Sequence, residues 1–238
     1  ECHIHMLETK TQAVTGQEFF GSTLPEYMAE IGALSRHTTF AHGIWVTDSD
    51  IDLLASAGVS VSHNPISNMK LGSGIAPWRK YHDAGVTMGL GTDGWSSSDT
   101  PRMMEVMKMA ALLHKVTDSD RRTWPTVDEA LRAATINGAY SAVLDRKIGS
   151  LEVGKKADLL VWDLTTLNFT PRQRLDHQLV YSENGTSLEY VMVNGRVTVD
   201  HGRLTTMDED AILTEFNALL PEIKSWQDRT DQLNDVFL

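Results

Sequence analysis

The sequence contains a single cysteine, Cys2, among its 238 residues. One cysteine excludes an internal disulfide framework and is typical of a reducing compartment, so we expect a cytoplasmic protein. Basic residues are also scarce: 21 Lys and Arg stand against 32 Asp and Glu, a formal net charge of −11. There is no apolar run of the roughly 18 residues that a membrane-spanning helix needs. The sequence therefore predicts neither nucleic acid nor a membrane as a partner.

Short apolar runs alternate with helical stretches through residues 1–146, and the first such run already begins at the first residue. One helix is predicted from the capping pair Thr47 and Asp50 to Gly58. A longer one is predicted over residues 127–144, after Thr126. Strands that alternate with helices in this way indicate parallel βα units, so the predicted fold class is α/β.

The character of the sequence changes near Lys147. Residues 147–205 are rich in Val and Leu, and Asn194-Gly195 between two such runs is a strong hairpin signal. Residues 206–238 are predicted to be helical, with an amphipathic stretch around DEDAILTEFNALL. We therefore expect three segments, a βα segment over 1–146, a β-rich segment over 147–205 and a helical segment over 206–238.

Side chains that can carry chemistry close four of the apolar runs: His5, His42, His63 and Asp93. In a (β/α)8 barrel the carboxyl ends of the strands face one cavity, where catalytic groups collect. Imidazoles and a carboxylate that converge there suit zinc or iron(II). Gly89 and Gly91 precede Asp93 at a spacing of two, and we expect them to leave room for a metal or a ligand.

Each of these residues also has an ordinary structural interpretation. A single histidine is usually solvated or hydrogen-bonded, Asp93 in GTDG is also typical of a turn, and Glu8 can be a surface charge. The grouping at matching strand ends favours a site. Serine-hydrolase chemistry is disfavoured because the sequence has no G-x-S-x-G motif; Gly72-Ser73-Gly74 lacks that pattern.

Four segments, in order, closely resemble the amidohydrolase superfamily: HIHMLET, AHGIWVTDSDIDLLASAGVSVSHNPISNMKLGSGIAP, GLGTDGWSS and IGSLEVGKKADLLVWD. They are most similar to the branch of S-adenosylhomocysteine and methylthioadenosine deaminases, guanine-type deaminases and triazine chlorohydrolases. The resemblance runs from residue 1 to about residue 200. It implies a TIM-like metallo-hydrolase barrel with a small β-sandwich domain.

The resemblance also implies which part of that fold this chain forms. The His-x-His pair of the family's first strand lies much farther before the GTDG aspartate than His5 lies before Asp93. ECHIHMLET instead resembles the fifth strand, with His5 at the metal-binding position and Glu8 at the catalytic one; His3 matches neither. We therefore expect the second half of the barrel, then part of the β-sandwich domain and a C-terminal helix.

By this resemblance, His5 and Asp93 bind one divalent ion, zinc or iron(II), and Asp93 also accepts a proton from the water on that ion. Glu8 carries a proton to the ring nitrogen or to departing ammonia. His42 hydrogen-bonds the water or the substrate. His63 and Trp95 are expected to contact the substrate, although either can instead be a packing residue.

The function implied is hydrolytic deamination of a purine- or pyrimidine-like heterocycle. Dechlorination or dealkylamination of a triazine is the alternative, and a catalytically silent fragment or assembly module is the alternative of another class. Only two matched ligands are present and no other His-x-His follows, so we expect residues 1–238 alone to be inactive, metal-poor and prone to associate. A homodimer is expected at full length. The substrate, the choice of metal and the oligomeric state stay open.

Overall fold

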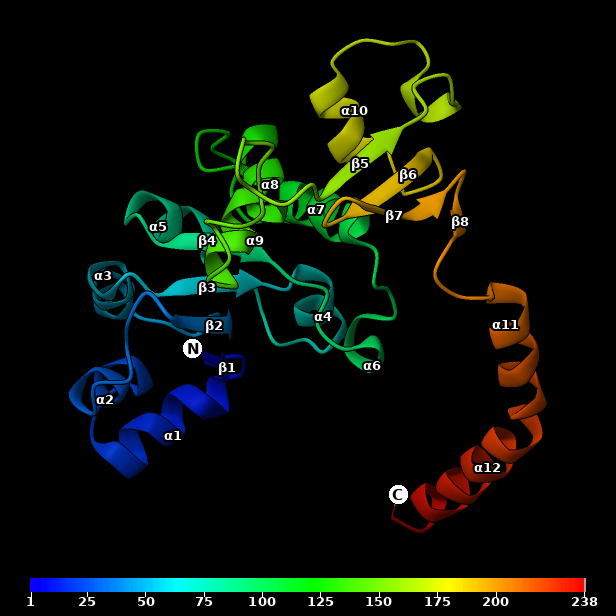
Figure 1. Cartoon of the computed structure of the whole chain (residues 1–238). Coiled ribbons are helices and arrows are strands. Elements are labelled where there is room, and N and C mark those ends of the chain that lie inside the picture. Colours follow the sequence, from blue (N-terminus) through cyan, green and yellow to red (C-terminus); the bar gives the residue numbers. More distant parts are fainter. Residues whose placement is uncertain (238) are drawn as a thin grey trace.

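The computed structural model describes the backbone of residues 1–237 and the side chains of residues 1–230. Two four-stranded sheets form its framework, a parallel sheet near the amino terminus and an antiparallel sheet farther along the chain. Figure 1 shows helices packed against the parallel sheet and a pair of helices that extends away from both sheets at the carboxyl terminus. The predicted α/β class is confirmed.

The parallel sheet follows chain order, with β1 (Cys2–Met6), β2 (Thr38–His42), β3 (Ser60–His63) and β4 (Thr87–Leu90). All three ladders are parallel, so the carboxyl ends of the four strands meet at one edge. β2 lies inside the sheet and all five of its residues are buried, whereas four of the five residues of β1 are exposed. This arrangement is the partial barrel that the sequence predicts, with β1 at an open side.

Nine helices connect and cover these strands: α1 (Lys10–Phe20), α2 (Leu24–Glu30), α3 (Asp48–Ala57), α4 (Pro65–Lys70), α5 (Trp78–Asp83), α6 (Trp95–Ser98), α7 (Met103–Leu113), α8 (Val127–Ala134) and α9 (Ile136–Ser141). The predicted α3 is confirmed. The hydroxyl of Thr47 accepts from the amide of Asp50, the Asp50 carboxylate accepts from the amide of Thr47, and Gly58 ends the helix at φ 72°. The core between sheet and helices includes Phe40 and Val61 from the strands.

The helix predicted over residues 127–144 is wrong in two respects, because the chain breaks at Thr135 into α8 and α9 and because α9 already ends at Ser141. Thr135 has φ −127° and ψ −89°, outside helical geometry. The break lets α9 lie across the parallel sheet, where the side-chain Nδ2 of Asn137 donates to the backbone carbonyl of Met88. The tertiary contact with β4 thus overrides a continuous helical pattern.

The space beside Gly89 and Gly91 is filled by the protein itself, contrary to the expected opening for a metal. A Cβ at Gly89 would lie 3.0 Å from the Ser141 hydroxyl, on α9. A Cβ at Gly91 would lie 2.4 Å from the Asn64 side-chain oxygen. Both glycines therefore permit close packing of neighbouring segments against β4.

The antiparallel sheet contains β5 (Leu159–Trp162), β6 (Leu188–Val193), β7 (Arg196–Asp200) and β8 (Arg203–Leu204), in that spatial order. The hairpin predicted at Asn194-Gly195 is confirmed: both residues have positive φ, 51° and 78°, and join β6 to β7. A 3-10 helix, η1 (Leu167–Phe169), and α10 (Leu175–Tyr181) lie between β5 and β6.

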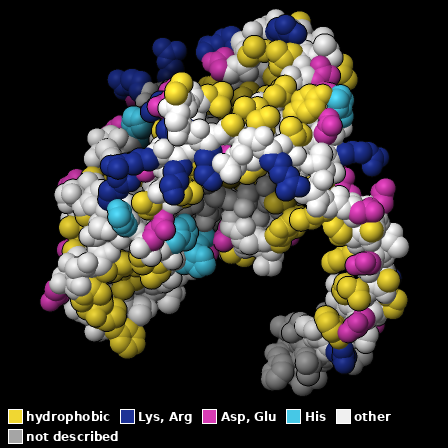
Figure 2. Space-filling view, in the orientation of Figure 1, with side chains coloured by type: hydrophobic (Ala, Val, Ile, Leu, Met, Phe, Trp, Pro, Cys, Tyr) yellow, Lys and Arg dark blue, Asp and Glu magenta, His cyan; other side chains and the backbone are white. Residues whose placement is uncertain are grey.

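The chain ends in α11 (Glu209–Ala218) and α12 (Leu220–Phe237), so the predicted C-terminal helical segment is present. These helices form an arm that carries both acidic and apolar side chains on its surface (Figure 2). The exposed apolar residues there include Leu213, Phe216 and Trp226. None of the helices within the described residues is long and apolar enough to cross a membrane. The proposed domain limits at 146 and 205 stay a prediction.

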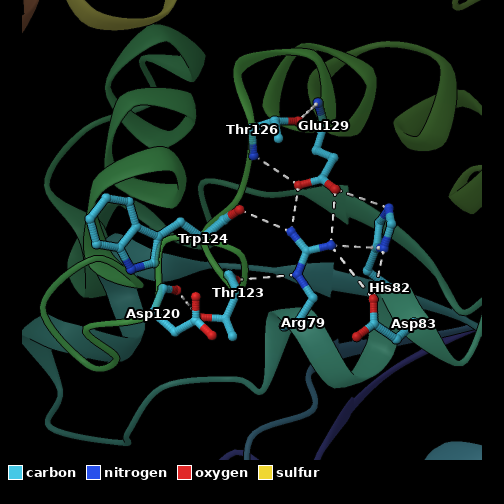
Figure 3. A network of polar contacts seen from close by, with 8 residues as sticks. All are labelled: Arg79, His82, Asp83, Asp120, Thr123, Trp124, Thr126 and Glu129. Carbon is cyan, nitrogen blue, oxygen red and sulfur yellow. Dashed lines mark hydrogen bonds and ion pairs between the residues drawn. The ribbon is translucent and has the colours of Figure 1, made fainter.

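A polar network fastens α5 to α8 and to the loop before it (Figure 3). Arg79 donates to both carboxylate oxygens of Glu129, at 3.1 and 3.0 Å, and to the carbonyls of Thr123 and Trp124, at 3.2 and 2.9 Å. Burial opposes ionisation of Glu129, but these hydrogen bonds and the charge of Arg79 hold its pKa below the ordinary value. The guanidinium thus joins three segments through one side chain.

Arg79→Lys is expected to lower the free energy of unfolding by about 1–2 kcal/mol, because lysine cannot span the carboxylate and both carbonyls at once. Urea unfolding measures this. Arg122→Lys is the matched control, since Arg122 also forks onto one carboxylate, that of Asp120, but is exposed. Equal losses of stability in the two variants would contradict the assigned role of Arg79.

Candidate metal and catalytic site

Three of the predicted site residues meet at the carboxyl edge of the parallel sheet. His5 comes from β1, His42 is the last residue of β2, and Asp93 follows β4. One nitrogen of each histidine and one oxygen of Asp93 all lie within 4.8 Å of one another. The two imidazole rings are 5.3 Å apart between centroids. Residues far apart in the sequence thus offer two nitrogens and one oxygen to a common point.

The backbone conformation at the strand ends turns two of these side chains inward. His5 is paired with Ala41 in the ladder, so in a regular strand His42 would point to the opposite face. His42 instead has φ 75°, and Asp93 has φ 60°. Positive φ is uncommon for residues other than glycine and is concentrated at functional sites. The local backbone therefore brings His42 to the same side as His5.

Asp93 is held as a carboxylate by several donors. The hydroxyls of Ser67 and Ser97 donate to its Oδ2 atom, at 2.6 and 2.9 Å. Burial opposes ionisation, but these hydroxyls, the amide of Gly94 and the nearby His42 together hold the pKa of Asp93 below its ordinary value. Asp93 is therefore negatively charged at neutral pH, the form that binds a cation.

Glu8 lies just beyond the end of β1, where the sequence reasoning expects it. β1 ends at Met6, and Leu7 has φ 53°, which bends the chain before Glu8. The Glu8 Oε2 atom is 3.8 Å from His42 Nε2, and its Oε1 atom accepts from the Ser73 hydroxyl at 3.3 Å. A partly exposed carboxylate thus faces the three-residue group.

The donor set fits a divalent ion of the zinc type. Zinc is commonly bound by imidazole nitrogens and carboxylate oxygens, with three protein ligands in catalytic sites. The sequence reasoning counted only His5 and Asp93 as ligands. The structure adds one ring nitrogen of His42, which can complete a set of three or hydrogen-bond a water on the ion. The resemblance assigns His42 to the water or the substrate, and the structure places one of its ring nitrogens together with the two expected ligands.

The structure places His63 apart from this group. His63 pairs with Leu90 in the ladder and is fully buried, with its ring 5.6 Å from that of Trp78 and 5.4 Å from that of His114. Neither ring nitrogen has a hydrogen-bond partner among the described residues. Burial, followed by the charges of His114 and His42, lowers the pKa of His63 to about 3. Substrate contact by His63 stays a prediction that this placement does not favour.

The buried histidines give folding a predictable pH dependence. Burial lowers the pKa of His114 to about 4, with Arg79 adding to the effect. Both folded-state values lie below the unfolded value near 6.5, so stability is complete above pH 6.5 and is lost as the pH falls. Between pH 6 and 4, each histidine is expected to contribute up to about 1.4 kcal/mol per pH unit to the slope of the free energy of unfolding against pH. Urea unfolding at pH 7, 6 and 5 measures it.

His63→Phe is expected to reduce this slope, because it replaces the buried imidazole with a ring of similar shape that binds no proton. His37→Phe, at an exposed position, serves as the control. An unchanged pH slope in His63→Phe would show that His63 is protonated equally in the folded and unfolded states.

Trp95 lies at the start of α6, two residues after Asp93, and 70% of its surface is exposed. No contact described here joins it to the three-residue group, so its role as a wall for a substrate ring stays a prediction. The sequence reasoning missed four polar residues that contact the site residues: Ser67, Asn68, Ser73 and Ser97. Three of them lie in SHNPISNMKLGSG, a segment that carries part of the resemblance to the family.

Comparison with known proteins decides the family. A model of the amidohydrolase family matches residues 1–198. The chain belongs to this family. Its segments from HIHMLET to GTDG, which carry the resemblance described above, all fall inside the match.

Relatives of this amidohydrolase share both sequence and fold with it. The 5'-deoxyadenosine deaminase of Methanosarcina acetivorans is 39% identical over 221 residues, which are 93% of this chain and 50% of that protein. A zinc-bound adenosine deaminase from Xanthomonas campestris superposes with a TM-score of 0.85 at 31% identity, over 95% of this chain and 50% of that one. A zinc complex of atrazine chlorohydrolase from Arthrobacter aurescens gives a TM-score of 0.86 at 30% identity, over 92% and 48%. The chain thus spans about half the length of the relatives it matches.

Proposed function

We propose that this chain supplies the catalytic edge of a metal-dependent deaminase that acts on a purine- or pyrimidine-like ring. The observation that carries this proposal is the convergence of His5, His42 and Asp93 within 4.8 Å, with Glu8 beside them. A metal-binding carboxylate, two imidazoles and a second carboxylate near the same edge are the groups that hydrolysis by an activated water requires.

In this proposal His5 and Asp93 hold one divalent ion, with zinc preferred to iron(II). A zinc ion held there would lower the pKa of its water from 15.7 to about 7 and so supply a nucleophile at neutral pH. Asp93 takes up the proton of the attacking water, since its low pKa keeps it ionised beforehand. His42 Nε2, which lies 3.8 Å from Glu8 Oε2, would orient that water.

Glu8 has the position of a proton shuttle. Its carboxylate is not among the three grouped donors, yet Oε2 lies 3.8 Å from His42 Nε2. The bend at Leu7 raises it above the strand end, from where it can reach a bound ring. Glu8 carries a proton of the attacking water to the ring nitrogen or to the departing ammonia, which is typical of general acid and base catalysis.

Two observations on relatives support a ring substrate. The Methanosarcina acetivorans relative is a deaminase of 5'-deoxyadenosine, and the Xanthomonas campestris structure is an adenosine deaminase with bound zinc. Dechlorination or dealkylamination of a triazine is the second candidate, favoured by the similarity to atrazine chlorohydrolase. A silent fragment or assembly module is the third, because the chain spans only half of these relatives.

The protein is further proposed to act in the cytoplasm as a homodimer at full length. The exposed free thiol of Cys2 fits a reducing compartment. Exposed apolar side chains on α1, such as Phe19, offer surface that association can bury.

The test compares two proteins. One is the 238-residue chain alone, and the other, called the fused protein here, carries the remaining half of the Methanosarcina acetivorans deaminase joined before Glu1. Metal content, oligomeric state and release of ammonia are measured with 5'-deoxyadenosine, adenosine, guanine and cytosine, and release of chloride with atrazine. The unmodified Methanosarcina deaminase is the positive control.

We expect the chain alone to be inactive and metal-poor, and the fused protein to bind about one zinc and to release ammonia from a nucleoside or base. Chloride release without ammonia release would favour the triazine reaction. A folded, zinc-loaded fused protein without any turnover would favour the silent module and contradict the proposal.

A further inference from the structure

The short helix α4 contacts two of the site residues, Asp93 and His42. α4 directly follows β3, and its consecutive residues Ser67 and Asn68 have no exposed surface. Ser67 donates to Asp93, and Asn68 faces His42 with 2.7 Å between the Asn68 Oδ1 and His42 Nδ1 atoms. Neighbouring positions of one helix therefore contact two site residues that come from different strands.

The contact with Asn68 determines how the His42 ring is protonated. A side-chain amide oxygen only accepts hydrogen bonds, so a hydrogen bond at this contact requires the hydrogen on His42 Nδ1. A neutral imidazole has one hydrogen, and Nε2 is then left with its lone pair. His42 is only 1% exposed, so bulk water does not compete for the ring.

The other ring nitrogen is the one that faces the site. His42 Nε2 lies 3.8 Å from Glu8 Oε2, and because Nδ1 contacts Asn68, Nε2 is the nitrogen left for the grouped donors. A lone pair there can bind a cation or accept a hydrogen bond from water. An Nε2–H would instead point a hydrogen at the cation position, and the Nδ1 and Oδ1 lone pairs would face each other.

We propose that Asn68 is a positioning residue that fixes His42 in the Nδ1–H tautomer and so presents the Nε2 lone pair to the metal and its water. This inference rests on the proposed function for its purpose, but the tautomer exists whether or not the protein deaminates anything. Hydrogen bonds behind a metal-site histidine commonly set its tautomer in this manner.

The experiment is nitrogen-15 NMR of the His42 ring in the metal-free 238-residue chain at pH 8, above the ordinary pKa of imidazole. His42→Gln assigns the signal. Three variants are compared with the wild type: Asn68→Ala removes the acceptor, Asn68→Asp keeps an acceptor oxygen, and Met69→Ala alters an exposed neighbour on the same helix.

We expect Nδ1–H as the main form of His42 in the wild type, Asn68→Asp and Met69→Ala. In Asn68→Ala the Nδ1–H share should fall to the minor form. An Nε2–H ring in the wild type would overturn the proposal, and so would an unchanged ring in a folded Asn68→Ala. If Asn68→Ala does not fold, loss of Nδ1–H in Asn68→Asp overturns the proposal and its retention upholds it.

The outcome separates this inference from the proposed function. Failure of the fused protein to release ammonia contradicts the deaminase assignment and leaves the tautomer result intact. The wrong tautomer contradicts the role of Asn68 even in an active enzyme.

Discussion

Replacing Glu8 by Gln in the fused protein is expected to lower kcat by about 10²-fold or more, with no change in zinc content. The amide keeps the shape of the side chain and can still contact Ser73, but it cannot take up and release a proton. The grouped donors His5, His42 and Asp93 do not include Glu8, so the metal should stay bound. Glu8 therefore contributes to turnover and not to metal affinity.

The measurement is steady-state ammonia release at saturating substrate, with zinc determined on the same samples. Glu18→Gln is the matched control, because Glu18 is an exposed residue of the following helix α1 and the same charge is removed. The control should retain the wild-type kcat. Near-normal turnover of Glu8→Gln would show that another group transfers the proton, and zinc loss in that variant would make Glu8 a ligand.

Much of the site follows from the sequence because it depends on strand ends. His5 and Asp93 each follow an apolar run that forms a parallel strand, and parallel strands place their carboxyl ends at one edge. The position of Glu8 also follows, since a residue three places after His5 must leave the strand to reach the same side. Local sequence signals of this kind predict the structure correctly, and the cap at Thr47 and the turn at Asn194-Gly195 are further examples.

The remaining features depend on contacts between segments that the sequence does not place. The side chain of His42 turns inward because its backbone has φ 75°, and no residue type in AHGIW predicts a positive φ at this histidine. The contacts of Ser67 and Asn68 exist only because α4 packs behind the ends of β2 and β4. The break at Thr135 likewise depends on the packing of α9 against the sheet.

Strand alternation predicts the face of the sheet to which the His63 side chain points. In the run from Val59 to His63, the histidine shares a face with Val61, which is completely buried. Residues at that spacing point to the helix-covered side of the sheet. Alternation thus predicts the orientation of His63, whereas His42 departs from it because its backbone has φ 75°.

The second large effect concerns the metal. His5→Ala in the fused protein is expected to weaken zinc binding by more than the 10- to 100-fold that loss of a supporting contact costs, because it removes a ligand itself. Asp93→Ala should have a similar effect. His3→Ala is the matched control, since His3 lies on the same strand and the same face two residues earlier, and does not belong to the grouped donors.

Calorimetric titration of zinc into these variants tests most directly whether this edge of the sheet is a metal site. The account predicts nearly unchanged affinity in His3→Ala and a loss of more than about 100-fold in His5→Ala. Equal affinities in the wild type, His3→Ala and His5→Ala would contradict it.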